Sequence, residues 1–171
     1  MPQVEIFTPT GVVAGTSSRP GLTQSPDLRS PVPVEGARWY PLDGSRPEHR
    51  GSVLVPPDDV LLVCTGDPEI TLHATWYSVV IEIGPYRVRG RMPTPVGFDP
   101  ARALARPGGA FVALHDVVIE LMDRGDAGVA ERPNVHVSRY AVEKVESSLM
   151  LGFFFPGATF TAPAPIEAPV A

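Results

Sequence analysis

Three arginines at alternate positions form the group of side chains best suited to binding a charged ligand. The segment from Arg87 to Arg91 reads Arg-Val-Arg-Gly-Arg, and in a strand its three guanidinium groups would lie on one face. Guanidinium groups pair with phosphate and stack on flat rings. The row therefore predicts either a contact surface for a ligand or partner, formed by Arg87, Arg89 and Arg91, or the solvated face of a strand.

The R-x-x-x-R spacing of this segment resembles that of the cyclic-dinucleotide-binding PilZ barrels, which implies nucleotide sensing. Those domains also carry a later Asp/Asn-x-Ser-x-x-Gly motif, whereas the nearest approach here, Asp43 to Glu48, comes earlier and ends in Glu. RNA binding by the same arginines would need interleaved aromatic residues for base stacking. The net charge of −5 also disfavours nucleic acid as a partner.

The other reactive residue types do not form a catalytic or metal-binding pattern. The four histidines lack the spacing of metal ligands on one helix face. His115 and Asp116 are adjacent, and neighbours in a strand point to opposite faces, so they are poorly placed to act as base and partner. Cys64 follows the apolar run Val60 to Val63, which predicts a buried, inert thiol. We therefore expect a non-enzymatic protein with no catalytic residue, no metal site and no cofactor.

An apolar segment near the C-terminus is a second candidate contact surface. Ser148 to Pro156 reads SLMLGFFFP and contains Phe153, Phe154 and Phe155, and a Pro/Ala-rich run follows. Three phenylalanines left in water would promote aggregation, so they must be covered. Either Leu149 to Phe155 pairs as a final strand on the protein's own sheet, or it docks on another subunit or a larger partner. Removing residues 149–171 is expected to lower stability or change the oligomer size.

The elements that must position these residues are strands, because apolar residues recur with period two. A turn at Gly84-Pro85 separates two of them, and frequent proline excludes long helices. One short helix is expected from Pro100 to Arg106, capped by Asp99 and ended by Pro107. The expected strands are Val53–Val55, Val60–Val63, Val79–Ile83, Tyr86–Gly90, Phe111–Leu121 and Val135–Val137.

The order of these elements occurs twice in the chain. The matching blocks are Val4-x-Ile6 with Val79-x-Ile81, Val13-x-Gly15 with Val88-x-Gly90, Val32-Pro-Val34 with Val112-Ala-Leu114, and Val53-x-Val55-x4-Val60-x-x-Val63 with Val135-x-Val137-x4-Val142-x-x-Val145. Ser25-Pro26 also matches Asp99-Pro100, and across all the blocks the offset between copies stays between 74 and 82 residues. An internal duplication predicts that Val63 and Val145 are both buried at equivalent positions. Trp39, Tyr40, Trp76 and Tyr77 are the expected joint core or interface between the copies.

The second copy, from about Trp76 to Glu146, has a strand pair that ends in Gly, a short capped helix, the strand FVALHDVVIEL and the closing segment VHVSRYAVEKVE. In this pattern it resembles bacterial single-copy domains of the small-barrel kind, and the overall order is similar to that of Sm-like and SH3-like barrels. The first copy, from about Val4 to Cys64, resembles them more weakly. The resemblance and the repeat together predict a mainly β protein of two tandem small five-stranded barrels, packed together and carrying one short helix. The domains would be residues 1–66 and 67–147, with a tail at 148–171. The alternative is a single irregular β-sandwich.

Composition limits the function further. The chain is 43% hydrophobic, which favours a folded core, and it has no apolar run long enough to cross a bilayer. Its first residues lack signal-peptide features, so a cytoplasmic location is expected. We expect a protein-binding or assembly component with a protein partner or a homo-oligomer. The alternatives are a small-ligand or nucleotide sensor that uses the arginine row, and an RNA-associated Sm-like module.

Overall fold

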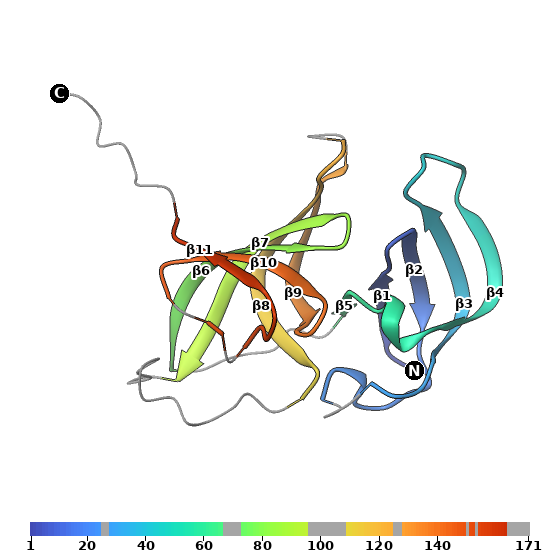
Figure 1. The fold of residues 1–171 in the computed structure, drawn as a ribbon. Helices are drawn as coiled ribbons and strands as arrows, with labels where there is room; N and C mark the ends of the chain where they lie inside the picture. The colour runs from blue at the N-terminus through green and yellow to red at the C-terminus, as the bar shows by residue number, and fades with distance from the viewer. Residues whose placement is uncertain are drawn as a thin grey trace.

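The computed structural model describes residues 1–24, 28–66, 73–95, 109–124, 128–149, 151–152 and 154–163 (Figure 1). Within these ranges there are eleven strands and two short 3₁₀ turns. The strands are β1 (Gln3–Phe7), β2 (Gly11–Thr16), β3 (Val32–Pro41), β4 (Glu48–Val55), β5 (Leu62–Thr65), β6 (Ala74–Ile83), β7 (Tyr86–Pro95), β8 (Phe111–Leu121), β9 (Ala130–Ser138), β10 (Val142–Ser147) and β11 (Thr159–Thr161). The 3₁₀ turns are η1 (Leu22–Gln24) and η2 (Pro57–Asp59). No helix in the described ranges could span a membrane.

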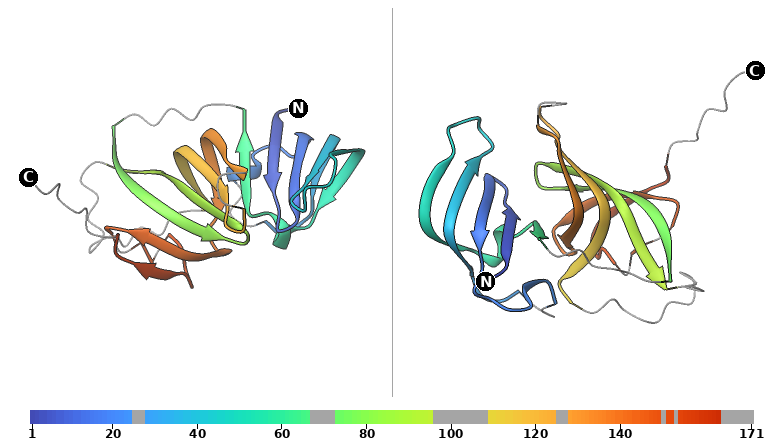
Figure 2. Two further views of the ribbon diagram at one scale, coloured as in Figure 1. Left: turned by 90° about the horizontal axis from the view of Figure 1, so that it is seen from above. Right: turned by 180° about the vertical axis from the view of Figure 1, so that it is seen from behind.

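The strands form one open sheet in the order β11-β10-β6-β7-β8-β9-β5-β1-β2-β3-β4. The pairings of the described strands are antiparallel except that of β10 with β11. The ribbon views place β1 to β4 in one group and β6 to β11 in another, with β5 between them (Figures 1 and 2). The prediction of a mainly β protein is confirmed. The described pairings close neither half into a barrel, because β5 continues the sheet by pairing with β9.

Several local predictions from the sequence are confirmed. β8 has the predicted bounds Phe111–Leu121, and the turn at Gly84-Pro85 joins β6 to β7. Gly84 has a φ of 52°, a conformation that glycine adopts without the strain a Cβ would add. The segment between β4 and β5 contains the 3₁₀ turn η2. The short helix expected from Pro100 to Arg106 lies outside the described residues.

The two halves have the same strand order and the same register. β5-β1-β2-β3-β4 in the first half corresponds to β10-β6-β7-β8-β9 in the second. Equivalent cross-strand pairs are Val4↔Gly15 with Val79↔Gly90, Ile6↔Val63 with Ile81↔Val145, and Val34↔Val53 with Leu114↔Val135. Val63 and Val145 are both fully buried, as predicted. The offsets read from the sequence are thus the offsets of the paired residues.

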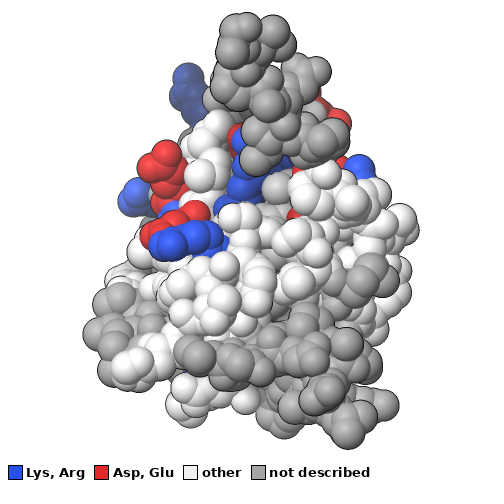
Figure 3. Space-filling model, turned by 90° about the vertical axis from the view of Figure 1, so that its left-hand side faces the viewer, with Lys and Arg blue, Asp and Glu red and all other residues white. Residues whose placement is uncertain are grey.

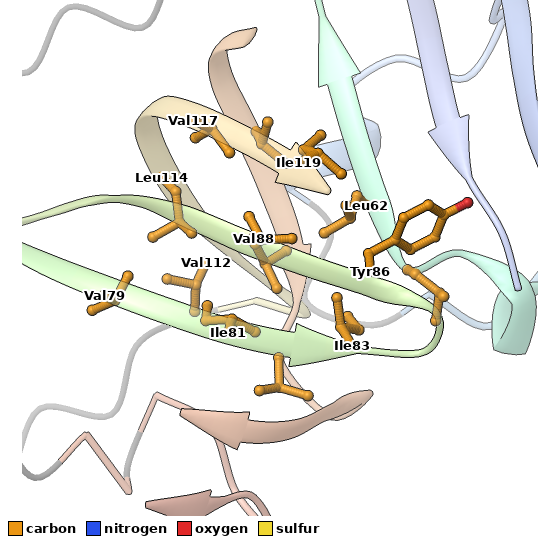
Figure 4. Packing of buried hydrophobic residues seen from close by; sticks show 14 of the residues in the cluster. Leu62, Val79, Ile81, Ile83, Tyr86, Val88, Val112, Leu114, Val117 and Ile119 are labelled. Carbon is orange, nitrogen blue, oxygen red and sulfur yellow. The ribbon is translucent and has the colours of Figure 1, made fainter. Parts of the chain in front are cut away.

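Among the residues that the structure describes, two hydrophobic clusters fill the interior, and each takes residues from both halves. The larger cluster is built on β6 to β10 and includes Phe7, Leu61 and Leu62 from the first half. Figure 4 shows Leu62 among residues of the second half. The smaller one is built on β1 to β5 and includes Ala110 and Phe111 from the second half. Burying each large aliphatic side chain stabilises the fold by about 1.5–3 kcal/mol. The halves therefore share their cores.

The aromatic residues predicted to form the joint core do not do so. Trp39, Trp76 and Tyr77 are only half-buried, and Tyr40 is 37% exposed. The aromatic contact between the halves is instead Phe7 with Tyr86, whose ring centroids lie 5.5 Å apart edge to face. The prediction was wrong because it relied on residue size, whereas in these strands the register decides which side chains point inward.

Polar contacts also join the halves. Tyr86 is buried at the end of the β6–β7 hairpin and points toward the first half (Figure 4). Its hydroxyl donates to the carbonyl oxygen of Thr8 at 2.7 Å. Arg132 on β9 binds the carboxylate of Glu5 on β1 through two hydrogen bonds of 2.6 and 3.0 Å. Both contacts lie beside the pairing of β5 with β9 and fix how the halves meet.

Candidate functional site

The arginine row on β7 is matched by acidic residues on the neighbouring strands. Arg87 lies 3.6 Å from Glu82 and 3.8 Å from Glu146. Arg89 lies 3.4 Å from Glu120, and Arg91 pairs with Asp116. On the face shown in Figure 3, Lys and Arg side chains likewise lie beside Asp and Glu. A ligand phosphate would have to compete with these carboxylates for each guanidinium group.

The last of these arginines, Arg91, lies at a β-bulge. The register shifts between Arg89 and Arg91, and Asp116 has a φ of 50° at the same level of β8. The Arg91 guanidinium lies 5.1 Å from the Trp76 ring centroid, and the His115 ring meets the same Trp76 edge to face at 4.9 Å. His115 is buried against this ring while Asp116 is exposed and holds Arg91. This arrangement is a packed structural cluster.

Cys64 on β5 is buried, as predicted. Burial raises the pKa of its thiol to about 12, and the negative charge of Glu5 adds to this shift. The thiolate is therefore scarce at neutral pH, and a thiol in this state is a poor nucleophile. Among the described residues, no group of three or more His, Cys, Asp or Glu side chains could hold a metal ion.

Cys64 is expected to resist labelling by a thiol reagent in the native protein at pH 8. The reagent should react only as fast as the protein opens, because the thiol is both buried and protonated. The readout is the labelling rate with Ellman's reagent, with the protein in denaturant as the control that must release one equivalent at once. Rapid, complete labelling under native conditions would show that Cys64 is accessible and reactive.

The apolar C-terminal segment folds onto the chain's own core. Leu151 and Phe155 are fully buried in the larger cluster, and Phe154 packs half-buried against it. Phe153 lies outside the described residues. The predicted final strand over 149–155 was wrong, because the described part of this segment forms turns, with the Phe155 amide donating to the Leu151 carbonyl oxygen at 3.1 Å. Phe155 is therefore not available as the partner contact predicted for it.

Arg139 holds this segment in place, a role that the sequence pattern did not suggest. Arg139 follows β9 directly and is only 5% exposed. Its Nε donates to the Phe154 carbonyl oxygen and its Nη1 to the Gly109 carbonyl oxygen, both at 3.0 Å. The strand that follows the segment is β11, which pairs in parallel with β10. The segment thus positions a short strand on one end of the sheet.

The other end of the sheet is the edge of β4. Among the described residues β4 pairs only with β3, so one side of its backbone faces solvent. Leu54 lies opposite Pro33 in this pair, and proline has no N–H to donate. Because proline in a sheet sits where its position needs no ladder N–H, we infer that Leu54 and Pro33 form a non-hydrogen-bonded pair, in which the N–H and C=O of Leu54 point to the open side. The Leu54 side chain is also exposed, at 66%.

Comparison with protein-family models, with curated proteins and with solved structures gives no significant match. The function must therefore be argued from the chain's own residues. Two features described above could bind a partner: the arginine row, whose charges are already paired, and the open edge of β4.

Proposed function

We propose that this chain is a non-enzymatic, protein-binding assembly component built from a duplicated five-stranded β unit whose strand order is that of small Sm-like or SH3-like barrels. The observation that supports this best is the junction between the halves. There one five-stranded unit docks on the next by pairing β5 with β9, edge to edge. A unit that associates with its own copy through strand edges is suited to assembly.

The open edge of β4 extends this argument beyond the single chain. Unpaired edges with exposed apolar side chains are templates for further strand pairing. Natural sheets protect such edges with charge, proline or coverage. Glu48 and Arg50 supply charge at the start of β4, whereas Leu54 near its end presents an exposed apolar side chain on the unpaired side of the strand. The edge therefore supplies the contact that an assembly component requires.

The two alternative functions have less support. A nucleotide sensor and an RNA-associated module would both need unengaged guanidinium groups on β7. Arg87, Arg89 and Arg91 each lie against a carboxylate instead, and the chain carries a net charge of −5.

Replacing Leu54 with proline is expected to weaken self-association of the full-length chain by about tenfold. Proline removes an outward N–H and places its ring where a partner strand would pair, while the bonds from β4 to β3 are kept. Sedimentation velocity from 1 to 100 µM measures the change. Wild-type protein should show a mass that rises with concentration.

The matched control is Leu54→Ala, which removes the side chain and keeps the N–H. It should weaken association less than Leu54→Pro does. A thermal melt of each variant checks that the fold is retained, and Leu54→Lys serves as a second edge-blocking variant. The proposed function would be contradicted if the wild-type chain stayed monomeric at all concentrations. It would also be contradicted if none of the three Leu54 substitutions changed the association.

A further inference from the structure

The junction between the halves shows which residues pair when one repeat unit docks on another. Leu62 on β5 lies opposite Val137 on β9, and Val63 lies opposite His136. The Ser138 amide adds a hydrogen bond to the Leu61 carbonyl oxygen at 2.9 Å. Leu62, Val63 and Val137 are fully buried and His136 is 5% exposed, so docking covers every side chain of the paired residues.

Because the two halves are equivalent, the strands at the two ends of the sheet correspond to the two strands that pair at the junction. β10 is the equivalent of β5, so Lys144 and Val145 correspond to Leu62 and Val63. β4 is the equivalent of β9, so Leu54 and Val55 correspond to His136 and Val137. The chain thus has a β9-like edge at one end and a β5-like edge at the other.

The β10 end is covered by β11, and the covered residues are those that the repeat assigns to docking. Lys144 pairs with Thr159 and Val145 pairs with Phe160, in parallel. The cap is small, because β11 has three residues, of which Thr159 and Thr161 are exposed and Phe160 is half-buried. Parallel pairing is also slightly less stable per residue than the antiparallel pairing of the junction.

The β4 end has the features expected of a partner strand for the β10 edge. Leu54 stands at the position of His136, and its backbone groups already point outward. Its side chain is 66% exposed, whereas His136 is 5% exposed at the junction. Docking in the same geometry would therefore cover an apolar side chain that is now in water, which is favourable. One bond is lost, because Pro56 stands at the position of Ser138 and has no amide to donate.

We propose that the β10 edge takes β4 of a second copy of this chain in antiparallel register, with Leu54 opposite Val145 and Val55 opposite Lys144, and that β11 is the displaceable strand that occupies this edge beforehand. The proposal rests on the proposed function and names the partner of the β4 edge. Because the two edges differ, the contact is heterologous, and copies would add head to tail into a ring or a filament.

Replacing Phe160 with proline in the full-length chain tests this proposal. Proline within a three-residue strand should release β11 from β10, while Leu151 and Phe155 remain in the core. The variant is expected to self-associate at a concentration at least tenfold lower than the wild type, as measured by sedimentation velocity. Adding Leu54→Pro should reverse the gain. Phe160→Val is the matched control, because valine keeps a strand-forming residue there, and Phe160→Gly is a second variant that weakens the cap without a proline ring.

The outcomes separate this proposal from the proposed function. If the wild type assembles through Leu54 and the Phe160 variants match its concentration dependence, the β10 site is wrong and the assembly role stands. If the wild type stays monomeric while Phe160→Pro associates in a Leu54-dependent way, the β10 site stands and the assembly role of the intact chain is wrong. Association of Phe160→Pro that does not respond to Leu54→Pro would overturn the pairing of β4 with β10.

Discussion

Replacing Phe155 with alanine is expected to lower the free energy of unfolding by about 3–5 kcal/mol. Phe155 is fully buried in the larger cluster beside Leu151, so its loss leaves a cavity that neighbouring side chains fill only in part. Urea denaturation gives the change in free energy, provided that the slope with denaturant is unchanged.

The matched control is Phe154→Ala. Phe154 has the same side chain one position earlier but is only half-buried, so its replacement should cost distinctly less. Equal costs would mean that the burial of Phe155 does not hold in solution. The comparison also explains what removing residues 149–171 would do: Leu151 and Phe155 would leave together, and the loss of core would obscure any effect on assembly.

Replacing Gly15 with alanine is expected to destabilise the protein by about 3 kcal/mol, whereas the same change at the equivalent Gly90 should cost about 1 kcal/mol. A Cβ at Gly15 would lie 2.5 Å from the Glu35 carbonyl oxygen and 2.7 Å from Cγ1 of Val34. At Gly90 the nearest atoms are 3.1 Å away or more, and the first is a methyl group of Val117. Backbone oxygen yields less readily than a side-chain methyl.

Thermal or urea unfolding of the two glycine variants side by side measures the difference. The positions are equivalent by register, since Gly15 pairs with Val4 and Gly90 with Val79. Each variant is therefore the control for the other. A Gly90→Ala cost equal to that of Gly15→Ala would contradict the close approach of β3 to β2 at this point.

Local pattern was sufficient to locate at least part of most strands and to identify equivalent positions in the two halves, but it did not indicate β11 or the full length of β4. Alternation located β6, β7 and β8, and the repeated valines placed Val63 and Val145 at equivalent buried positions. Register follows from such patterns because a shift by one residue would turn the apolar side chains outward.

The pattern could not predict how the halves join. The pairing of Val63 with His136 links segments distant in sequence, and edge residues carry no signal for their partner. The pairing of the arginine row with acidic residues was in part predictable from the sequence. Glu82 lies directly opposite Arg87 across the Gly84-Pro85 turn, so the hairpin register alone pairs an acid with the first arginine.

The junction also determines the order in which the two halves can fold during synthesis. The pairing of β5 with β9 closes a loop of roughly seventy residues, and such a contact forms only after the entropy of closure is overcome. The first half leaves the ribosome earlier and can pair β1 to β5 on its own. Until β9 follows, Leu61, Leu62 and Phe7 lack the neighbours that bury them. During this time β5 of the nascent chain can pair with the wrong strand. A chaperone that covers β5 would reduce such mispairing, and slow translation of the second half would prolong the exposure.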